Sequence, residues 1–283
     1  MSRTVQDFLG ASPTARIAAR LELGGRRTVT IWENRDDRVL YETPAGHTFS
    51  FYLEGGTGTR RLDAGAVAGW PGAVCILPEG QGSAWEITAP FRFVHLYLPD
   101  DALRAAYAMT HDCDARRLEV RDVTFAALPE IGAPLRRLAL AAEAQDRLAA
   151  DGALAELVGA LPARRLAVKG GLSPLALRRI DDWIEAHLEG PIRLADLAAL
   201  AGLSEFHVQR MFRLCRGVSP HGWVTQRRIA RAQALLRGPE PLAGIAAACG
   251  FSSQSHFTRV FGRETGLTPA AYRAGADLGG LRR

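Results

Sequence analysis

Short apolar runs, with turn residues between them, fill the first third of the chain. Their β-branched and aromatic side chains favour extended structure, and several alternate with polar positions as half-buried strands do. The strand candidates are residues 28–32, 47–53, 60–63, 73–77, 83–88 and 91–98. Many short strands at this spacing predict a β-sandwich or a small barrel.

The apolar spacing becomes helical after residue 100. Residues 100–110 and a stretch rich in Ala and Leu, from about 134 to 161, predict helices. The mixture of Pro, Gly and basic residues that follows predicts an interdomain linker at 164–172. Ser-Pro pairs at 173–174 and 219–220 then predict the starts of two further helices, because Ser caps a helix and Pro suits its first turn.

The C-terminal third contains the same unit twice. Residues 194–204 align with 242–252, and residues 210–223 align with 259–272. Each copy predicts a short apolar helix, a turn that contains glycine, and a second helix, which is the helix-turn-helix pattern. One copy alone would be equally consistent with a structural helical hairpin, and the duplication favours a functional interpretation.

The second helix of each copy separates a buried face from an outer face at 3.6 residues per turn. The predicted buried positions are Val208, Met211 and Phe212 in the first copy, and Phe257, Val260 and Phe261 in the second. The outer positions are Phe206, Gln209, Arg210 and Arg213 in the first copy, and Gln254, Ser255, Thr258 and Arg259 in the second. Arg and Gln pair with guanine and adenine edges, and hydroxyl groups contact bases or phosphates. The outer faces therefore predict contact with double-stranded DNA.

Residues 175–273 resemble the DNA-binding domain of the AraC-type bacterial transcription factors, most closely over residues 245–273. The resemblance implies a sequence-specific regulator whose outer positions contact DNA. It also implies a homodimer, a small-molecule effector and RNA polymerase as further partners. Gly262 departs from the family pattern, because many members carry Lys or Arg there for a backbone-phosphate contact.

Residues 71–87 resemble the second sequence motif of cupin barrels through Gly72, Pro78 and Gly80. Ser83 stands where that motif has a metal-binding His, and no His-x-His pair precedes it, so no metal site and no cofactor are expected. The resemblance implies a non-catalytic barrel that holds a small effector. Candidate effector contacts are His47, Trp70, Trp85, His95 and Tyr97. Ordinary packing is the alternative interpretation for each of them.

Several alternatives stay open from the sequence. The helices at 134–161 either pair two subunits or cover the barrel, and either alternate face of residues 91–98 could point inward. Arg227, Arg228 and Arg231 lie on the helix between the repeats and either contact phosphates or are solvated. The rival functions are a cupin-like metal-dependent isomerase or oxygenase with a basic helical appendage, and an architectural DNA binder without an effector.

Composition and charge narrow the class of protein. The 283 residues are 47% hydrophobic and 23% charged, which is typical of a soluble globular protein with two domains. The net charge is +5, and residues 173–283 carry 15 arginines against 9 acidic residues, as expected of the segment that meets a polyanion. The 4 cysteines show no metal or disulfide spacing. Without an apolar run of about 18 residues or a signal-peptide core, a cytoplasmic protein without membrane contact is expected.

Together these patterns predict an α+β protein that is not an enzyme. Its expected parts are a cupin-like effector-sensing barrel at 1–100, a helical coupling and dimerisation region at 101–163, the linker, and an all-α DNA-binding domain at 173–283. Two helix-turn-helix motifs, at about 194–213 and 242–262, are expected at the ends of a long helix.

Overall fold

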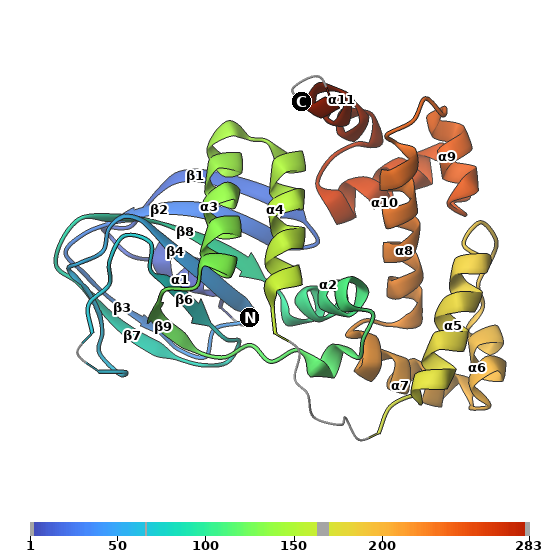
Figure 1. Cartoon of the computed structure of the whole chain (residues 1–283), viewed down its shortest axis with the longest axis horizontal. Coiled ribbons are helices and arrows are strands. Elements are labelled where there is room, and N and C mark those ends of the chain that lie inside the picture. The colour runs from blue at the N-terminus through green and yellow to red at the C-terminus, as the bar shows by residue number, and fades with distance from the viewer. Residues whose placement is uncertain (1–2, 66, 163–169, 281–283) are drawn as a thin grey trace. The chain divides into compact units, whose positions relative to one another are not determined.

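The computed structural model describes residues 3–65, 67–162 and 170–280. The chain divides into two compact units, of which the first comprises Met1–Leu103 and Glu119–Pro162. The second comprises Arg104–Leu118 and Ala163–Arg283. Figure 1 shows the strands of the first unit and the helices of both. Most of the predicted linker falls on residues 163–169, which lie outside the described residues.

The described strands of the first unit form two antiparallel sheets. The six-stranded sheet contains, in spatial order, β1 (Arg16–Gly24), β2 (Arg27–Asn34), β8 (Phe91–Leu98), β4 (His47–Gly55), β6 (Val74–Leu77) and β9 (Val123–Ala126). The three-stranded sheet contains β3 (Asp37–Tyr41), β7 (Ser83–Ile87) and β5 (Thr59–Arg61). All six strands predicted from the sequence are confirmed, as β2, β4, β5, β6, β7 and β8.

The predicted cupin-like barrel is not closed in the structure. Within the described residues, β3 and β5 pair along their length only with β7, so no hydrogen-bonded ladder closes one sheet onto the other. The two sheets instead share one core, to which the larger contributes Trp32 and Phe93 and the smaller contributes Trp85. Bulky side chains between facing sheets bury both apolar faces without any hydrogen bond between the sheet edges, as in a sandwich.

Strand β8 is buried on both faces, so each of the two alternate sets of side chains at residues 91–98 points into a packed interior. Phe91, Phe93 and Tyr97 belong to the core between the sheets. Val94 and Leu96 lie on the opposite face and are also buried. That face is covered by α3 (Pro129–Ala144), on which α4 (Arg147–Ala160) packs in turn (Figure 1). These helices therefore cover the larger sheet, and a role in pairing subunits stays a prediction.

The second unit is built from α5 (Pro174–Ala186), α6 (Leu194–Ala201), α7 (Glu205–Arg216), α8 (Pro220–Leu235), α9 (Leu242–Ala248), α10 (Gln254–Thr265) and α11 (Pro269–Gly280). The predicted Ser-Pro starts are confirmed, since Ser173 caps α5 and Ser219 caps α8 with their side chains. Ile180, Val208 and Phe212 are fully buried in the core that joins α5 to α7.

Residues 104–118 also belong to the second unit, although they follow the last long strand of the first in the sequence. They include most of α2 (Asp100–His111) and the 3-10 helix η1 (Ala115–Arg117). Ala108 and Ala115 join the core formed by α5 and α7. No helix among the described residues combines the length and the apolar character needed to cross a membrane. The four cysteines are free.

Candidate nucleic-acid interface

The two sequence repeats fold as the helix pairs α6–α7 and α9–α10. A glycine in the left-handed region ends the first helix of each pair, with φ of 63° at Gly202 and 71° at Gly250. Only a residue without a Cβ adopts this conformation at little cost, which explains why both repeats have glycine there. The Ser204 side chain accepts a hydrogen bond from the backbone N–H of His207. The Ser253 side chain accepts one from the backbone N–H of His256. The second cap lies one residue beyond the position aligned with Ser204, at the insertion between the repeats.

The predicted faces of α7 and α10 are confirmed as far as burial is concerned. Val208, Phe212, Phe257, Val260 and Phe261 are buried, and Met211 is partly buried. Phe206 is 78% exposed, which is unusual for a large aromatic side chain without a partner. The remaining predicted DNA contacts are exposed at Gln209, Arg210, Arg213, Gln254, Ser255 and Arg259, and partly buried at Thr258.

The arginines on these outer faces have no partner within the described part of the protein. Arg210, Arg213 and Arg259 make no hydrogen bond or ion pair with the described part of the chain. A guanidinium group with all its donors free is suited to bidentate contacts with a guanine or a phosphate. The outer faces therefore present donors to a ligand, whereas several other arginines of the described chain, such as Arg61, Arg216 and Arg228, donate to internal acceptors.

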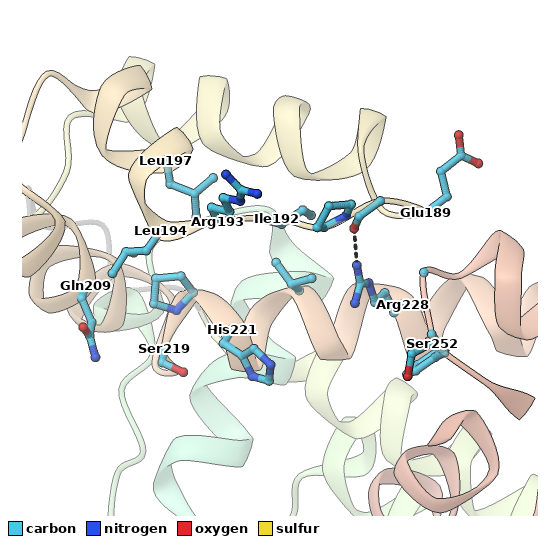
Figure 2. A pocket seen from close by; sticks show the side chains of 16 residues that line it. Glu189, Ile192, Arg193, Leu194, Leu197, Gln209, Ser219, His221, Arg228 and Ser252 are labelled. Carbon is cyan, nitrogen blue, oxygen red and sulfur yellow. Dashed lines mark hydrogen bonds between the residues drawn. The ribbon is translucent and has the colours of Figure 1, made fainter. Parts of the chain in front are cut away.

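A groove of about 680 Å³ lies within the second unit, between the two helix pairs. Figure 2 shows Gln209 of α7 at one end and Ser252, which precedes α10, at the other. Ser219 and His221, at the start of α8, lie along one wall between them. The groove thus connects the predicted recognition helices through a surface that carries both polar and apolar side chains.

The arginines of α8 behave differently from one another, which the sequence could not indicate. Arg227 forms an ion pair with Glu185 on α5. Arg228 donates from Nε to the carbonyl oxygen of Leu188 at 2.9 Å and from Nη2 to that of Gly190 at 2.6 Å. Burial lowers the pKa of Arg228. Arg228 is therefore committed to backbone acceptors instead of to phosphates.

Arg216, at the end of α7, was missed by the sequence reasoning. Its side chain is buried, forms an ion pair with Asp181, and donates from Nη1 to the Cys113 carbonyl oxygen at 2.8 Å. Its guanidinium carbon also lies 4.8 Å from the centre of the Trp223 ring. Burial raises the pKa of Asp181, and the attraction of Arg216 opposes that rise. The signal in the sequence was an arginine four residues after Phe212, on the apolar stripe.

The five candidate effector contacts in the first unit do not form one site. Trp85 and His95 line a cavity of about 30 Å³ between the sheets, while Trp70 is 36% exposed. Trp32 Nε1 donates to the Tyr97 hydroxyl at 2.9 Å, and that hydroxyl lies 3.0 Å from His95 Nδ1. Burial lowers the pKa of His95 to about 3, so the imidazole is neutral at physiological pH. The cavity has room for about one water molecule.

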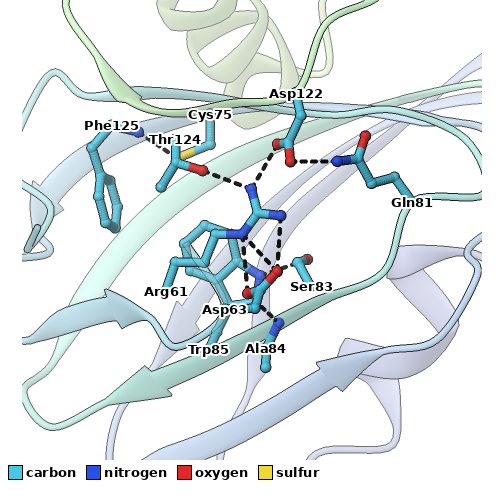
Figure 3. A network of polar contacts seen from close by, with 10 residues as sticks. All are labelled: Arg61, Asp63, Cys75, Gln81, Ser83, Ala84, Trp85, Asp122, Thr124 and Phe125. Atoms are coloured by element: carbon cyan, nitrogen blue, oxygen red, sulfur yellow. Dashed lines mark hydrogen bonds and ion pairs between the residues drawn. The ribbon is translucent and has the colours of Figure 1, made fainter. Parts of the chain in front are cut away.

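A buried arginine network at one end of the sandwich is a second feature that the sequence did not indicate (Figure 3). Arg61 donates to Asp63, to Asp122 at 2.6 Å and to Thr124 at 2.7 Å, and its side chain is only 4% exposed. Burial disfavours the charged guanidinium, but the hydrogen bonds that Arg61 donates to Asp122 and Asp63 outweigh this effect and raise the pKa of Arg61. The network fastens the segment before β9 to the smaller sheet.

His47, the remaining candidate, lies in a group of possible metal ligands with Glu79 and Asp100, whose ligand atoms are within 4.8 Å of one another. The backbone N–H of Glu79 donates to His47 Nδ1 at 3.1 Å, so the ring proton of the neutral imidazole is on Nε2, 3.0 Å from Asp100. A metal at Nε2 would have to displace that proton while Nδ1 cannot accept it. Hydrogen bonding therefore accounts for this group, and the expectation of no metal site stays a prediction.

Comparisons with known proteins find relatives of part of this chain. Residues 197–275 match a family described as a helix-turn-helix domain. Transcriptional regulator Rob of Salmonella typhimurium is 38% identical over 96 residues, which are 34% of this chain and 33% of Rob. A transcriptional regulator with an AraC-type DNA-binding domain, from Chromobacterium violaceum, has a crystal structure that is 30% identical and covers 36% of this chain and 91% of its own, with a TM-score of 0.34. The chain spans about a third of the length of the first curated relatives that it matches.

One relative is short enough to be matched almost completely. Regulatory protein SoxS of Salmonella typhimurium is 36% identical over 98 residues, which are 34% of this chain and 92% of SoxS. The family match at residues 197–275 includes α7 and α10, whose caps and outer faces are described above. The chain therefore belongs to the AraC-type family of helix-turn-helix transcriptional regulators.

Proposed function

We propose that this chain is a sequence-specific DNA-binding regulator of transcription in which α7 and α10 read two successive major grooves of one duplex. The observation that carries the proposal is the pair of outer faces with free arginines, presented by two similar helix pairs of one compact unit. Phe206, Gln209, Arg210 and Arg213 would contact one groove. Gln254, Ser255, Thr258 and Arg259 would contact the next.

The dimensions of α8 support this arrangement. Its 16 residues make a rod of about 24 Å, to which the helix pairs at its two ends add further length. Successive major grooves on one face of B-DNA are about 34 Å apart. The groove between the pairs would then receive the sugar-phosphate backbone that separates the two major grooves, with Ser219 and His221 as polar neighbours.

The proposal is tested by selecting bound sequences from random duplexes with the full-length protein. We expect two conserved half-sites about one helical turn apart, and we expect Arg210→Ala and Arg259→Ala each to relax preference in a different half-site. Recovery of a single uninterrupted site of a few base pairs, unchanged by either variant, would contradict the two-groove arrangement.

The regulatory part of the proposal concerns the first unit. We propose that it senses a small molecule and supports a homodimer, and that bound regulator influences RNA polymerase. A cavity of about 30 Å³ is far below the roughly 300–1,000 Å³ of ordinary ligand sites, so an effector larger than water requires the two sheets to separate. A screen for metabolites that raise the melting temperature of the full-length protein tests effector binding.

The enzyme alternative is not favoured by the site geometry. The position of the cupin metal ligand is occupied by Ser83, whose hydroxyl accepts a hydrogen bond from Trp85 Nε1 at 2.8 Å. His47 is held by hydrogen bonds that leave no lone pair for a metal. Stoichiometric iron, manganese or zinc in the purified protein would revive the alternative.

A further inference from the structure

We propose that Arg228 and Gly250 act together as a clamp that sets the orientation of the α9–α10 pair relative to the α6–α7 pair, and so selects the spacing between the two DNA half-sites. This inference rests on the proposed DNA-binding function. In it, Arg228 is a positioning residue that does not itself contact DNA.

Arg228 ties α8 to the chain that leads into the first helix pair. Its two donors reach the carbonyl oxygens of Leu188 and Gly190, in the connection between α5 and α6. Carbonyl groups just beyond the end of a helix lack intrahelical partners, so a guanidinium group there satisfies acceptors that would otherwise be unpaired. Figure 2 shows Arg228 rising from α8 toward this connection, with the bond to Gly190 drawn.

Gly250, in the turn of the second helix pair, lies against Arg228 and the α5–α6 connection. A Cβ atom at residue 250 would lie 2.2 Å from the Leu188 carbonyl oxygen and 2.7 Å from Arg228 Nη2. The turn between α9 and α10 therefore packs with its backbone directly on the Arg228 guanidinium and on one of its two acceptors, the Leu188 carbonyl group. Three segments meet here without room for a side chain, namely the α5–α6 connection, α8 and the α9–α10 turn.

Comparison of the two repeats shows that this contact is particular to the second. Gly202 occupies the corresponding turn of the first pair and has the same left-handed backbone, yet a Cβ there would meet no atom within 4 Å. Conformation alone therefore explains glycine at 202. At 250 both conformation and close approach require it, as expected of a residue at a junction between the two pairs.

The chemical identity of Arg228 matters for the clamp. A planar guanidinium spans two acceptors with fixed geometry, whereas a lysine ammonium is a single flexible point charge. With the clamp intact, binding of one recognition helix places the other at a defined distance along the duplex. With the clamp loosened, the second helix pair is less preorganised for the selected spacing. The affinity for the selected site then falls, and the affinity for sites of altered spacing falls less.

The test measures the affinity of the full-length protein for a bipartite site selected from random duplexes, for the same site with its spacer changed by one base pair, and for sites with one half scrambled. We expect Arg228→Gln and Arg228→Lys to reduce the preference for the selected spacing by about fivefold or more, as for a typical coupling between sites. Affinity for each isolated half-site should change less than about twofold.

The chain offers two matched controls. Arg227→Gln removes the neighbouring arginine of α8, whose partner is the Glu185 side chain, and should keep the wild-type spacing preference. Gly202→Ala and Gly250→Ala impose the same backbone strain, but only Gly250→Ala should relax the spacing preference. Circular dichroism melts of each variant set a temperature at which all of them are folded, and the affinities are compared there.

The outcomes separate the inference from the function on which it rests. If the wild-type protein selects no bipartite site, the proposed two-groove function fails. If the wild type discriminates between spacings and the variants at 228 and 250 discriminate equally well, the clamp is overturned while the function stands. If the variants at residue 228 are too unstable to fold, the comparison of Gly250→Ala with Gly202→Ala decides between these results.

Discussion

At the scale of single residues, two classes of arginine stand out: exposed ones without an internal partner and buried ones in hydrogen-bond networks. Arg210 and Arg259 are exposed and without internal partners in the described chain, whereas Arg216 and Arg61 are buried within networks of carboxylates and carbonyl groups. A buried guanidinium is tolerated only when acceptors replace its water shell, while an exposed one keeps its donors for a ligand. Exposure on the outer faces of α7 and α10, without an internal partner, therefore distinguishes the candidate DNA contacts from structural arginines.

The first prediction concerns the free arginines. Arg210→Ala and Arg259→Ala should each weaken specific binding by about 1–3 kcal/mol, because a bidentate contact to a base is lost. Gel-shift titration against the selected site and its single-base variants measures both affinity and preference. Arg237→Ala, an exposed arginine near the far end of α8, is the control and should alter neither base preference.

The second prediction concerns His95. Because its pKa is about 3 in the folded protein and near 6.5 when unfolded, the folded state binds fewer protons between these values. The stability due to neutral His95 is therefore complete above pH 6.5 and is lost progressively as the pH falls toward 3. Melting temperatures from pH 7.5 to 4.5 should fall less steeply for His95→Asn than for the wild type, and His207→Gln, at an exposed position, should follow the wild type.

At the scale of elements, each recognition helix uses one face for the core and the other for a ligand. Phe212 and Phe257 are fully buried, and Phe206 projects from the opposite side of α7. The buried faces hold α7 and α10 against their neighbours, because short helices obtain most of their stability from packing and not from propensity. Stability and DNA binding should therefore respond to different substitutions in the same helix.

The third prediction follows from this division. Phe212→Ala and Phe257→Ala should each destabilise the protein by about 3–5 kcal/mol through lost burial and cavity formation. Phe206→Ala should change stability by less than about 0.5 kcal/mol, yet weaken DNA binding. Denaturant titration of the same three variants measures the free energy of unfolding, and gel shifts measure DNA affinity. A large loss of stability for Phe206→Ala would mean that Phe206 belongs to the core and would contradict the prediction.

At the scale of the whole molecule, the boundary between the units does not follow the order of the sequence. Residues 104–118 lie in the sequence between strands β8 and β9 of the first unit, yet they pack in the second unit. Arg216 reaches the Cys113 carbonyl oxygen, and Arg116 Nη2 reaches that of Gly170 at 2.9 Å. The segment thus completes the core beneath α7.

The fourth prediction tests this role. A fragment of residues 173–283 should melt several degrees below a fragment that also carries residues 100–118 on a flexible linker, because it exposes apolar surface around Cys215 and leaves Arg216 without one acceptor. Thermal melts of the two fragments measure the difference. Equal melting temperatures would mean that residues 104–118 contribute nothing to the stability of the DNA-binding unit.

The features that were predictable are those encoded by local spacing. Six strands and the faces of α7 and α10 follow from side-chain periodicity within about a dozen residues, and the Ser-Pro helix starts follow from local capping preferences. Strands β1 and β3 were not predicted because charged residues interrupt their apolar pattern, and β9 was not predicted either. Their extended structure depends on pairing with partners that the local sequence does not reveal.

The sequence by itself determined two similar helix pairs, their buried and outer faces, and membership of a family, because each of these is written in short-range periodicity and in a repeated motif. Only the tertiary structure decided that the strands form two sheets and not a closed barrel, that Arg228 binds backbone carbonyl groups, and that residues 104–118 belong to the second unit. The physical reason is distance along the chain: Arg228 meets partners about 40 residues away and Arg216 one 103 residues away. Contacts of that separation depend on the packing of the whole unit, which no local pattern encodes.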